Sequence, residues 1–148
     1  PDRGAKPQRT PHSIHPFADT SALRHLRVLV VEDNRMNQKL LSAYLKSIEI
    51  DHLIVDDGLE AINVLKHDSF DLILLDLQMP NIDGFETARR IRKLESLRGA
   101  SRCYIIAVSA SAETKIEKCH QAGIDDFIAK PINFPQLGSA LKKSIQVS

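Results

Sequence analysis

One stretch of the chain constrains the fold more than any other: the apolar run at residues 72–75, which ends at Asp76. A run of Leu and Ile without polar alternation is typical of a strand that is buried on both of its faces. Such strands belong to parallel sheets that are covered by helices on both sides. Asp76 would then lie at the carboxyl end of its strand, where open α/β sheets bind their ligands.

The same pattern recurs along the chain, where apolar runs alternate with segments of helical periodicity. The expected strands are residues 27–32, 51–55, 70–76, 103–108 and 126–129, and the expected helices are about 35–48, 58–67, 84–97, 112–122 and 134–146. Five βα units predict an α/β fold with one five-stranded parallel sheet, doubly wound and flavodoxin-like, in the order 2-1-3-4-5. On the first helix we expect one buried face that carries Met36, Leu40, Leu41, Tyr44, Leu45 and Ile48.

Residues 1–26 differ from the rest of the chain. They contain four of its seven prolines and show no apolar period, so we expect a flexible linker or arm, ordered only near its end at Leu23 to Leu26. A short motif that docks on a partner is the alternative. Residues 27–148 are the expected folded domain, and 43% hydrophobic and 26% charged residues are ordinary for one globular domain.

The charge and the cysteines exclude several classes of function. The formal net charge is +1, and the part after residue 26 is close to neutral, which argues against nucleic acid as a direct partner. No segment has the length of a membrane span, so we expect no membrane contact by this chain. Cys103 and Cys119 lack metal-binding spacing and are expected to be reduced, structural thiols. We expect a solvated face on the third helix at Arg89, Arg90, Arg92 and Lys93.

Further charged residues end other predicted strands: Glu32 and Asp33 after the first, and Lys130 at the last. In the order 2-1-3-4-5, strands 1 and 3 are neighbours about 5 Å apart, so Glu32, Asp33 and Asp76 would share one pocket. Carboxylates that close repel one another, and a hard divalent cation relieves that repulsion. The alternative is that Asp33 or Asn34 only caps the first helix.

Asp76 could be a cation ligand alone or also a nucleophile that forms an acyl phosphate. Lys130 would supply positive charge to the phosphoryl group. Pro131 restricts Lys130 to an extended conformation, and a cis bond between them would aim the lysine inward. The hydroxyl of Ser109, at the end of the fourth strand, could donate to a phosphoryl oxygen, because Ser111 is the better candidate for a helix cap.

Taken together, residues 27–146 resemble the receiver domain of two-component response regulators. Four motifs carry the resemblance, each at a strand end: Val31-Glu32-Asp33-Asn34, Leu75-Asp76-Leu77-Gln78-Met79-Pro80 with Asp83-Gly84, Val108-Ser109-Ala110, and Asp126-Phe127-Ile128-Ala129-Lys130-Pro131. With Asn37, the first motif is most similar to receivers attached to hybrid histidine kinases.

The resemblance implies a role for each site residue. Asp76 would accept a phosphoryl group from a phosphohistidine. Mg²⁺ would be bound directly by Asp33, Asp76 and the backbone carbonyl of Gln78, and through water by Glu32. Ser109 and Lys130 would hold the phosphoryl oxygens, Ser109 and Phe127 would form the switch, and Gln78 and Ser111 would tune the lifetime of the acyl phosphate.

The same resemblance implies the partners and the context. The donor would be the dimerisation and phosphotransfer domain of a histidine kinase or a histidine phosphotransfer protein. The domain would catalyse its own phosphorylation and slow dephosphorylation. Helix four, strand five and helix five would form the responding face, with a weak homodimer through it. We expect a cytoplasmic location, including the cytoplasmic part of a membrane-anchored sensor kinase.

Four other functions compete with a receiver of a hybrid kinase. The first is a receiver cut from the output domain of a separate response regulator. The second is a non-cycling module that acts by protein contact, against which the complete set of acids, serine and lysine argues. A nucleotide or flavin binder would need a Gly-rich phosphate loop after the first strand, which the sequence lacks. An aspartyl phosphatase would want a second Asp where the chain has Gln78.

Overall fold

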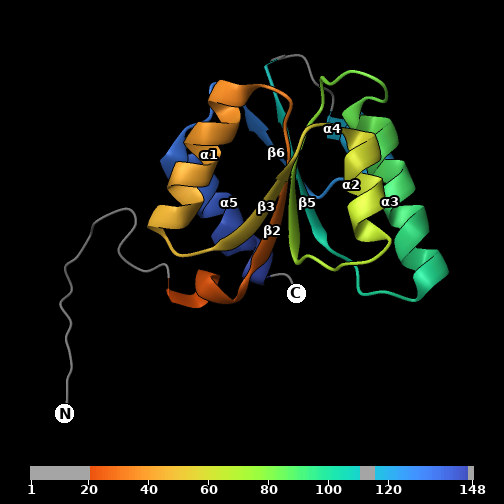
Figure 1. The fold of residues 1–148 in the computed structure, drawn as a ribbon, viewed down its shortest axis with the longest axis horizontal. Helices are drawn as coiled ribbons and strands as arrows, with labels where there is room; N and C mark the ends of the chain where they lie inside the picture. Colours follow the sequence, from red (N-terminus) through yellow and green to blue (C-terminus); the bar gives the residue numbers. More distant parts are fainter. Residues whose placement is uncertain (1–20, 111–115, 147–148) are drawn as a thin grey trace, which may run out of the picture.

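The computed structural model describes residues 21–110 and 116–146 of the chain. Within these residues, five parallel strands form one sheet in the order β3-β2-β4-β5-β6 (Figure 1). Counted along the chain, this is the predicted order 2-1-3-4-5, which is confirmed. The strands are β2 (Arg27–Val31), β3 (Asp51–Val55), β4 (Leu72–Asp76), β5 (Tyr104–Ser109) and β6 (Asp126–Ala129).

Helices cover both faces of the sheet. Figure 1 shows α1 and α5 on one side and α2, α3 and α4 on the other. Successive side chains of a strand point to opposite faces, so Val28 and Val30 join the core under α1 and α5, while Leu29 and Val31 join the core under the other helices. The helices are α1 (Arg35–Ser47), α2 (Gly58–Leu65), α3 (Gly84–Arg98), α4 (Ile116–Ala122) and α5 (Phe134–Gln146), with a 3-10 helix η2 (Ser21–His25) before β2.

Three helices begin at polar caps that follow the carboxyl ends of strands. Asn34 caps α1, Asp57 caps α2 and Asp83 caps α3. In each case the side-chain oxygen accepts the backbone N–H of the residue three positions on, at 2.8 to 3.0 Å. Such a cap stabilises a helix by about 1 kcal/mol. The positive ends of these helices therefore lie at the same edge of the sheet as the carboxyl ends of β2, β3 and β4.

Helix α1 buries a narrower face than the sequence indicated. Leu41 and Leu45 are buried, but Met36 and Leu40 stay 66% and 50% exposed, so the prediction was wrong for these two residues. The buried stripe has the spacing 38-41-45 and starts at the polar Gln38. Met36 and Leu40 lie beside that stripe and leave apolar surface open near the start of the helix.

The end of the N-terminal segment packs onto the domain. Leu23, in η2, is fully buried in the core that α1 and α5 form with the sheet. The carbonyl of Leu23 accepts the N–H of Leu26 at 3.0 Å, which turns the chain into β2. Part of the expected arm is thus ordered and belongs to the folded unit. Residues 1–20 lie outside the described residues.

Replacing Leu23 with alanine should lower the free energy of unfolding by about 3 kcal/mol, because the change leaves a cavity in a closed core. Urea denaturation measures the effect. Arg24→Ala is the matched control, since its ion pair with Glu49 is exposed and should change stability by less than about 0.5 kcal/mol. Equal, small effects for both variants would show that η2 contributes nothing to the core.

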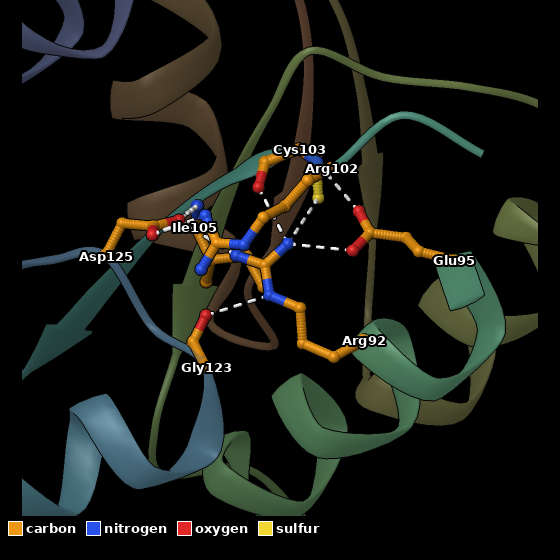
Figure 2. A network of polar contacts seen from close by, with 7 residues as sticks. All are labelled: Arg92, Glu95, Arg102, Cys103, Ile105, Gly123 and Asp125. Carbon is orange, nitrogen blue, oxygen red and sulfur yellow. Dashed lines mark hydrogen bonds and ion pairs between the residues drawn. The ribbon is translucent and has the colours of Figure 1, made fainter. Parts of the chain in front are cut away.

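A polar network joins α3 to the amino ends of β5 and β6, at the edge opposite the acidic residues. Figure 2 shows Arg92 at its centre. The guanidinium donates to the carbonyls of Gly123 and Cys103 at 2.9 and 2.8 Å, and to the carboxylates of Glu95 and Asp125 at 2.9 and 2.8 Å. Its side chain is only 17% exposed, so the prediction of a solvated position was wrong for this residue.

Both cysteines are buried and carry free thiols. Burial, together with the neighbouring carboxylate of Glu95, raises the pKa of Cys103 to about 12. Burial also raises the pKa of Cys119. Because the thiolate is the reactive form, both side chains are chemically quiet at neutral pH and act as small core residues.

Candidate functional site

Three carboxylates meet at the carboxyl edge of the sheet. Glu32 and Asp33 directly follow β2, and Asp76 ends β4. The two strands are hydrogen-bonded neighbours in which Val31 pairs with Leu75, so their ends coincide. One oxygen from each carboxylate lies within 4.8 Å of the others. Glu32 and Asp76 are buried and Asp33 is exposed, so the cluster opens to solvent on the side of Asp33.

Lys130 reaches this cluster from the end of β6. Its Nζ lies 3.2 Å from Oδ2 of Asp76 and 3.3 Å from Oε1 of Glu32. The peptide bond between Lys130 and Pro131 is cis, one of the two isomers that the sequence left open. Burial by itself lowers the pKa of Lys130, but the charges of Asp76 and Glu32 outweigh it and raise the pKa. The lysine therefore stays a cation at neutral pH.

Backbone amides hold the two buried carboxylates in place. Oδ1 of Asp76 accepts the N–H of Gln78 at 2.9 Å, and Oε2 of Glu32 accepts the N–H of Asn34 at 3.0 Å. Burial and the nearby charge of Asp76 raise the pKa of Glu32, although the Asn34 N–H and Lys130 act in the opposite direction. Three carboxylates lie around a single ammonium here, so the cluster has an excess of negative charge that a cation would relieve.

Asp33 does not cap α1, so its carboxylate remains available to the acidic cluster. Asn34 supplies the side chain that caps α1, so the alternative in which Asp33 serves as the cap does not hold. Hard oxygen donors of this kind suit Mg²⁺ and similar ions, which bind through one or two carboxylates and keep some water. The three carboxylates therefore fit a divalent cation in charge and in donor chemistry.

Close backbone packing fixes how near α3 begins to Asp76. A Cβ atom on Gly84 would lie 2.6 Å from Cα of Leu77 and 2.8 Å from the carbonyl oxygen of Asp76. Only glycine therefore lets α3 begin this close to the end of β4. The N–H of Gly84 donates to the carbonyl of Leu77 at 3.1 Å and closes the loop.

Three of the remaining predicted site residues, Ser109, Phe127 and Gln78, lie at or near the same edge. Ser109 ends β5 one residue after the partner of Asp76, is buried, and accepts the N–H of Lys130 at its carbonyl at 2.8 Å. Phe127, on β6, is half-buried and packs against the core under α2, α3 and α4. Gln78 is exposed next to Asp76. Ser111 lies outside the described residues.

Two residues behind the acidic cluster, Gln38 and Asp56, were not predicted from the sequence. Gln38 is buried on α1, and its Nε2 donates to the carbonyl of Glu32 at 2.6 Å and to Oδ1 of Asp56 at 2.8 Å. A signal was present in the sequence, because Gln38 stands at the start of the 38-41-45 stripe. A polar residue there needs partners, but the pattern does not say which.

The comparisons with known proteins agree with this geometry. Residues 28–142 match the family model of the response regulator receiver domain. The chain is 41% identical over 121 residues to hybrid signal transduction histidine kinase L of Dictyostelium discoideum. The aligned region covers 79% of this chain and 7% of the kinase. The chain therefore belongs to the response regulator receiver domain family, and it spans only a small part of the length of this relative.

Solved receiver structures share the fold. The receiver domain of the histidine kinase CKI1 from Arabidopsis thaliana, complexed with Mg²⁺ and BeF₃⁻, matches with a TM-score of 0.76 at 35% identity, covering 86% of this chain and 95% of that one. A second match is a chain from the co-crystal structure of the Saccharomyces cerevisiae histidine phosphotransfer signaling protein Ypd1 and the receiver domain of Ssk1. Its TM-score is 0.75 at 32% identity, covering 80% of this chain and 87% of that one.

Among residues 21–110 and 116–146, none of the helices combines the length and the hydropathy that crossing a bilayer requires.

Proposed function

We propose that this chain is a phosphoacceptor in a phosphorelay. A carboxylate oxygen of Asp76 attacks the phosphorus of a phosphohistidine and forms a P–O bond. The P–N bond breaks, and the imidazole keeps its electron pair. Water later attacks the acyl phosphate and releases inorganic phosphate. The observation that carries the proposal is the convergence of three carboxylates and the Lys130 ammonium at the end of β4, in a chain of the receiver family.

Each neighbour of Asp76 has a task in this reaction. Mg²⁺, when bound, would offset the negative charge that gathers on the phosphoryl oxygens. Its holders would be Asp33, Asp76, the carbonyl of Gln78 and, through water, Glu32. The Lys130 ammonium already lies 3.2 Å from the Asp76 carboxylate, and it would move to a phosphoryl oxygen once Asp76 is phosphorylated.

The proposed switch starts at Ser109. Its hydroxyl would donate to a phosphoryl oxygen, and the movement would change the packing of Phe127, which has no hydroxyl and acts by packing alone. Gln78 and Ser111 would set how readily water reaches the acyl phosphate. The responding face comprises α4, β6 and α5, where a homodimer could also form, and the change amounts to a population shift between two states.

A docking surface for the phosphohistidine partner lies beside the site. Met36 and Leu40 expose apolar surface on α1. A groove of about 360 Å³ runs next to them, lined by Leu40, Ala110, Lys130, Ile132 and Phe134 among others. Because Lys130 contributes to both the groove and the acidic cluster, a domain seated here would present its histidine to Asp76. The yeast co-crystal structure of Ypd1 with a receiver domain supports this class of partner.

The wider context rests on the relatives. The similarity to hybrid histidine kinases supports a receiver within a larger kinase. We further propose that it acts in the cytoplasm and that its folded unit comprises residues 27–148 together with the packed η2 segment before them. A receiver of a separate response regulator is the second candidate, since the Ssk1 structure pairs a receiver of that kind with its phosphotransfer protein.

Two donors test the function and the docking surface together. Phosphoramidate offers a P–N bond without a protein, and a phosphorylated histidine phosphotransfer protein offers the same bond on a docking partner. We expect transfer from both in the presence of Mg²⁺. Leu40→Glu should slow transfer from the protein donor about tenfold, a loss of about 1.4 kcal/mol of binding, and leave the phosphoramidate rate unchanged.

Leu59→Glu is the matched control, because it places the same charge at an equally exposed leucine on α2, across the sheet. No transfer from either donor would contradict the phosphoacceptor function. Equal transfer rates from the protein donor for both leucine variants would contradict the docking surface alone.

A further inference from the structure

A buried amide lies directly behind the acidic cluster. Gln38 is 7% exposed, and its side chain uses both ends of the amide. Nε2 donates to the carbonyl of Glu32 at 2.6 Å and to Oδ1 of Asp56 at 2.8 Å, while Oε1 accepts from Nη1 of Arg35 at 3.1 Å. One side chain thus joins α1 to the end of β2 and to the loop after β3.

The contact with the Glu32 carbonyl acts on Asp33. The peptide between these two residues is planar, so the direction of the carbonyl fixes the plane of the whole peptide. That plane in turn sets the position of Cα of Asp33, from which its carboxylate leaves toward Asp76. The Glu32 side chain has separate anchors in the Asn34 N–H and Lys130. Asp33 is exposed, and its carboxylate makes no hydrogen bond or ion pair with another described residue, so its backbone is what positions it.

The second acceptor of the Gln38 Nε2 group, the Asp56 carboxylate, is itself anchored. Asp56 follows β3, and its N–H donates to Oε1 of Glu60 at 3.1 Å, which ties it to the first turn of α2. Arg35 lies 3.8 Å from the same carboxylate. The donor amide is therefore held from two sides and cannot turn away from the Glu32 carbonyl without losing both of its acceptors.

We infer that Gln38 is a positioning residue for cation binding: its amide orients the peptide between Glu32 and Asp33 so that the Asp33 carboxylate is preorganised next to Asp76. The inference rests on the proposed function, in which these carboxylates hold Mg²⁺. Groups that orient metal ligands from behind typically account for 10-fold to 100-fold in metal affinity.

If Gln38 only tied α1 to the sheet, losing another hydrogen bond between α1 and the sheet should affect Mg²⁺ binding to the same extent. Ser42 lies one turn further along α1, and its Oγ is 3.0 Å from Nε2 of His52 on β3. This contact also ties α1 to the sheet but touches no backbone of the acidic cluster. Ser42→Ala is therefore the matched control for a lost α1 hydrogen bond.

The test is calorimetric titration of the full chain with Mg²⁺ alone. Gln38→Met keeps the length and burial of the side chain but removes both donors. We expect its dissociation constant for Mg²⁺ to rise about tenfold, with no change for Ser42→Ala. With phosphoramidate, Gln38→Met should require more Mg²⁺ for half-maximal rate but reach the wild-type rate at saturation.

Gln38→Leu is a second variant in case methionine perturbs the fold, and urea denaturation confirms that each variant is folded. Unchanged Mg²⁺ affinity in a folded Gln38 variant would overturn the inference while leaving the proposed function intact. Absence of Mg²⁺ binding in the wild type, or unchanged binding in Asp33→Asn, would overturn the proposed site and the inference with it.

Discussion

Replacing Asp76 with asparagine should abolish phosphorylation of the chain altogether. The amide has the same shape, and its oxygen can still accept the Gln78 N–H, but it offers no anionic oxygen to attack phosphorus. The loss is measured by intact mass after incubation with phosphoramidate and Mg²⁺. We expect no phosphoryl adduct under conditions in which the wild type is fully converted.

Asp57→Asn is the control for this experiment. Asp57 lies at the same edge of the sheet, and asparagine caps a helix as well as aspartate does, so α2 should be unaffected. This variant should be phosphorylated at the wild-type rate. An adduct that persists in Asp76→Asn would show that another residue is the nucleophile.

Replacing Arg92 with alanine should give the largest loss of stability among the arginines of α3, about 3 kcal/mol. The change leaves the Glu95 carboxylate without its cationic partner among the described residues, and leaves Asp125 with only the exposed Arg102, in a region where Arg92, Glu95 and Asp125 are all largely buried. It also removes the donors to the carbonyls of Cys103 and Gly123 (Figure 2). The shift in the urea midpoint measures the effect.

Arg90→Ala provides the comparison within the same helix. Arg90 pairs with Glu86 at 2.9 Å, but both side chains are exposed, so the loss should be about 0.5 kcal/mol. Similar losses for the two variants would show that the network around Arg92 is no stronger than a surface ion pair. Neither variant should change the Mg²⁺ requirement, because the network lies at the opposite edge of the sheet.

The sheet and the acidic site could be predicted because both follow from local sequence. Buried strands of a parallel sheet are continuous apolar runs, and the residue that ends such a run lies at the ligand edge whatever the rest of the chain does. Once the strand order is 2-1-3-4-5, Asp33 and Asp76 must be close. Lys130 and Ser109 followed from the same reasoning applied to the later strands.

The polar contacts behind these elements could not be predicted in the same way. Arg92 meets Asp125 across 33 positions of sequence. Four of the five residues at 89–93 are basic, and nothing in the sequence indicates which of them turns inward. Gln38 was not singled out in the sequence, and its acceptors come from the backbone of Glu32 and from the loop after β3. Periodicity identifies a face but not the partners that a buried polar group finds.

The exposed residues of α1 were missed for a related reason. Met36 and Leu40 fit the helical period nearly as well as their buried neighbours, and apolar type alone does not distinguish a core position from an exposed one. Leu23 is the opposite case, since a single leucine in a proline-rich segment has no period from which burial could be inferred.

Peptide mapping of the phosphorylated wild type shows directly whether Asp76 itself carries the phosphoryl group. The chain is incubated with phosphoramidate, with Mg²⁺ or with a chelator, and then digested and sequenced by mass spectrometry. We expect one acyl phosphate, formed only with Mg²⁺, on the peptide that contains Asp76. An adduct on another residue, or none in a folded protein, would contradict it.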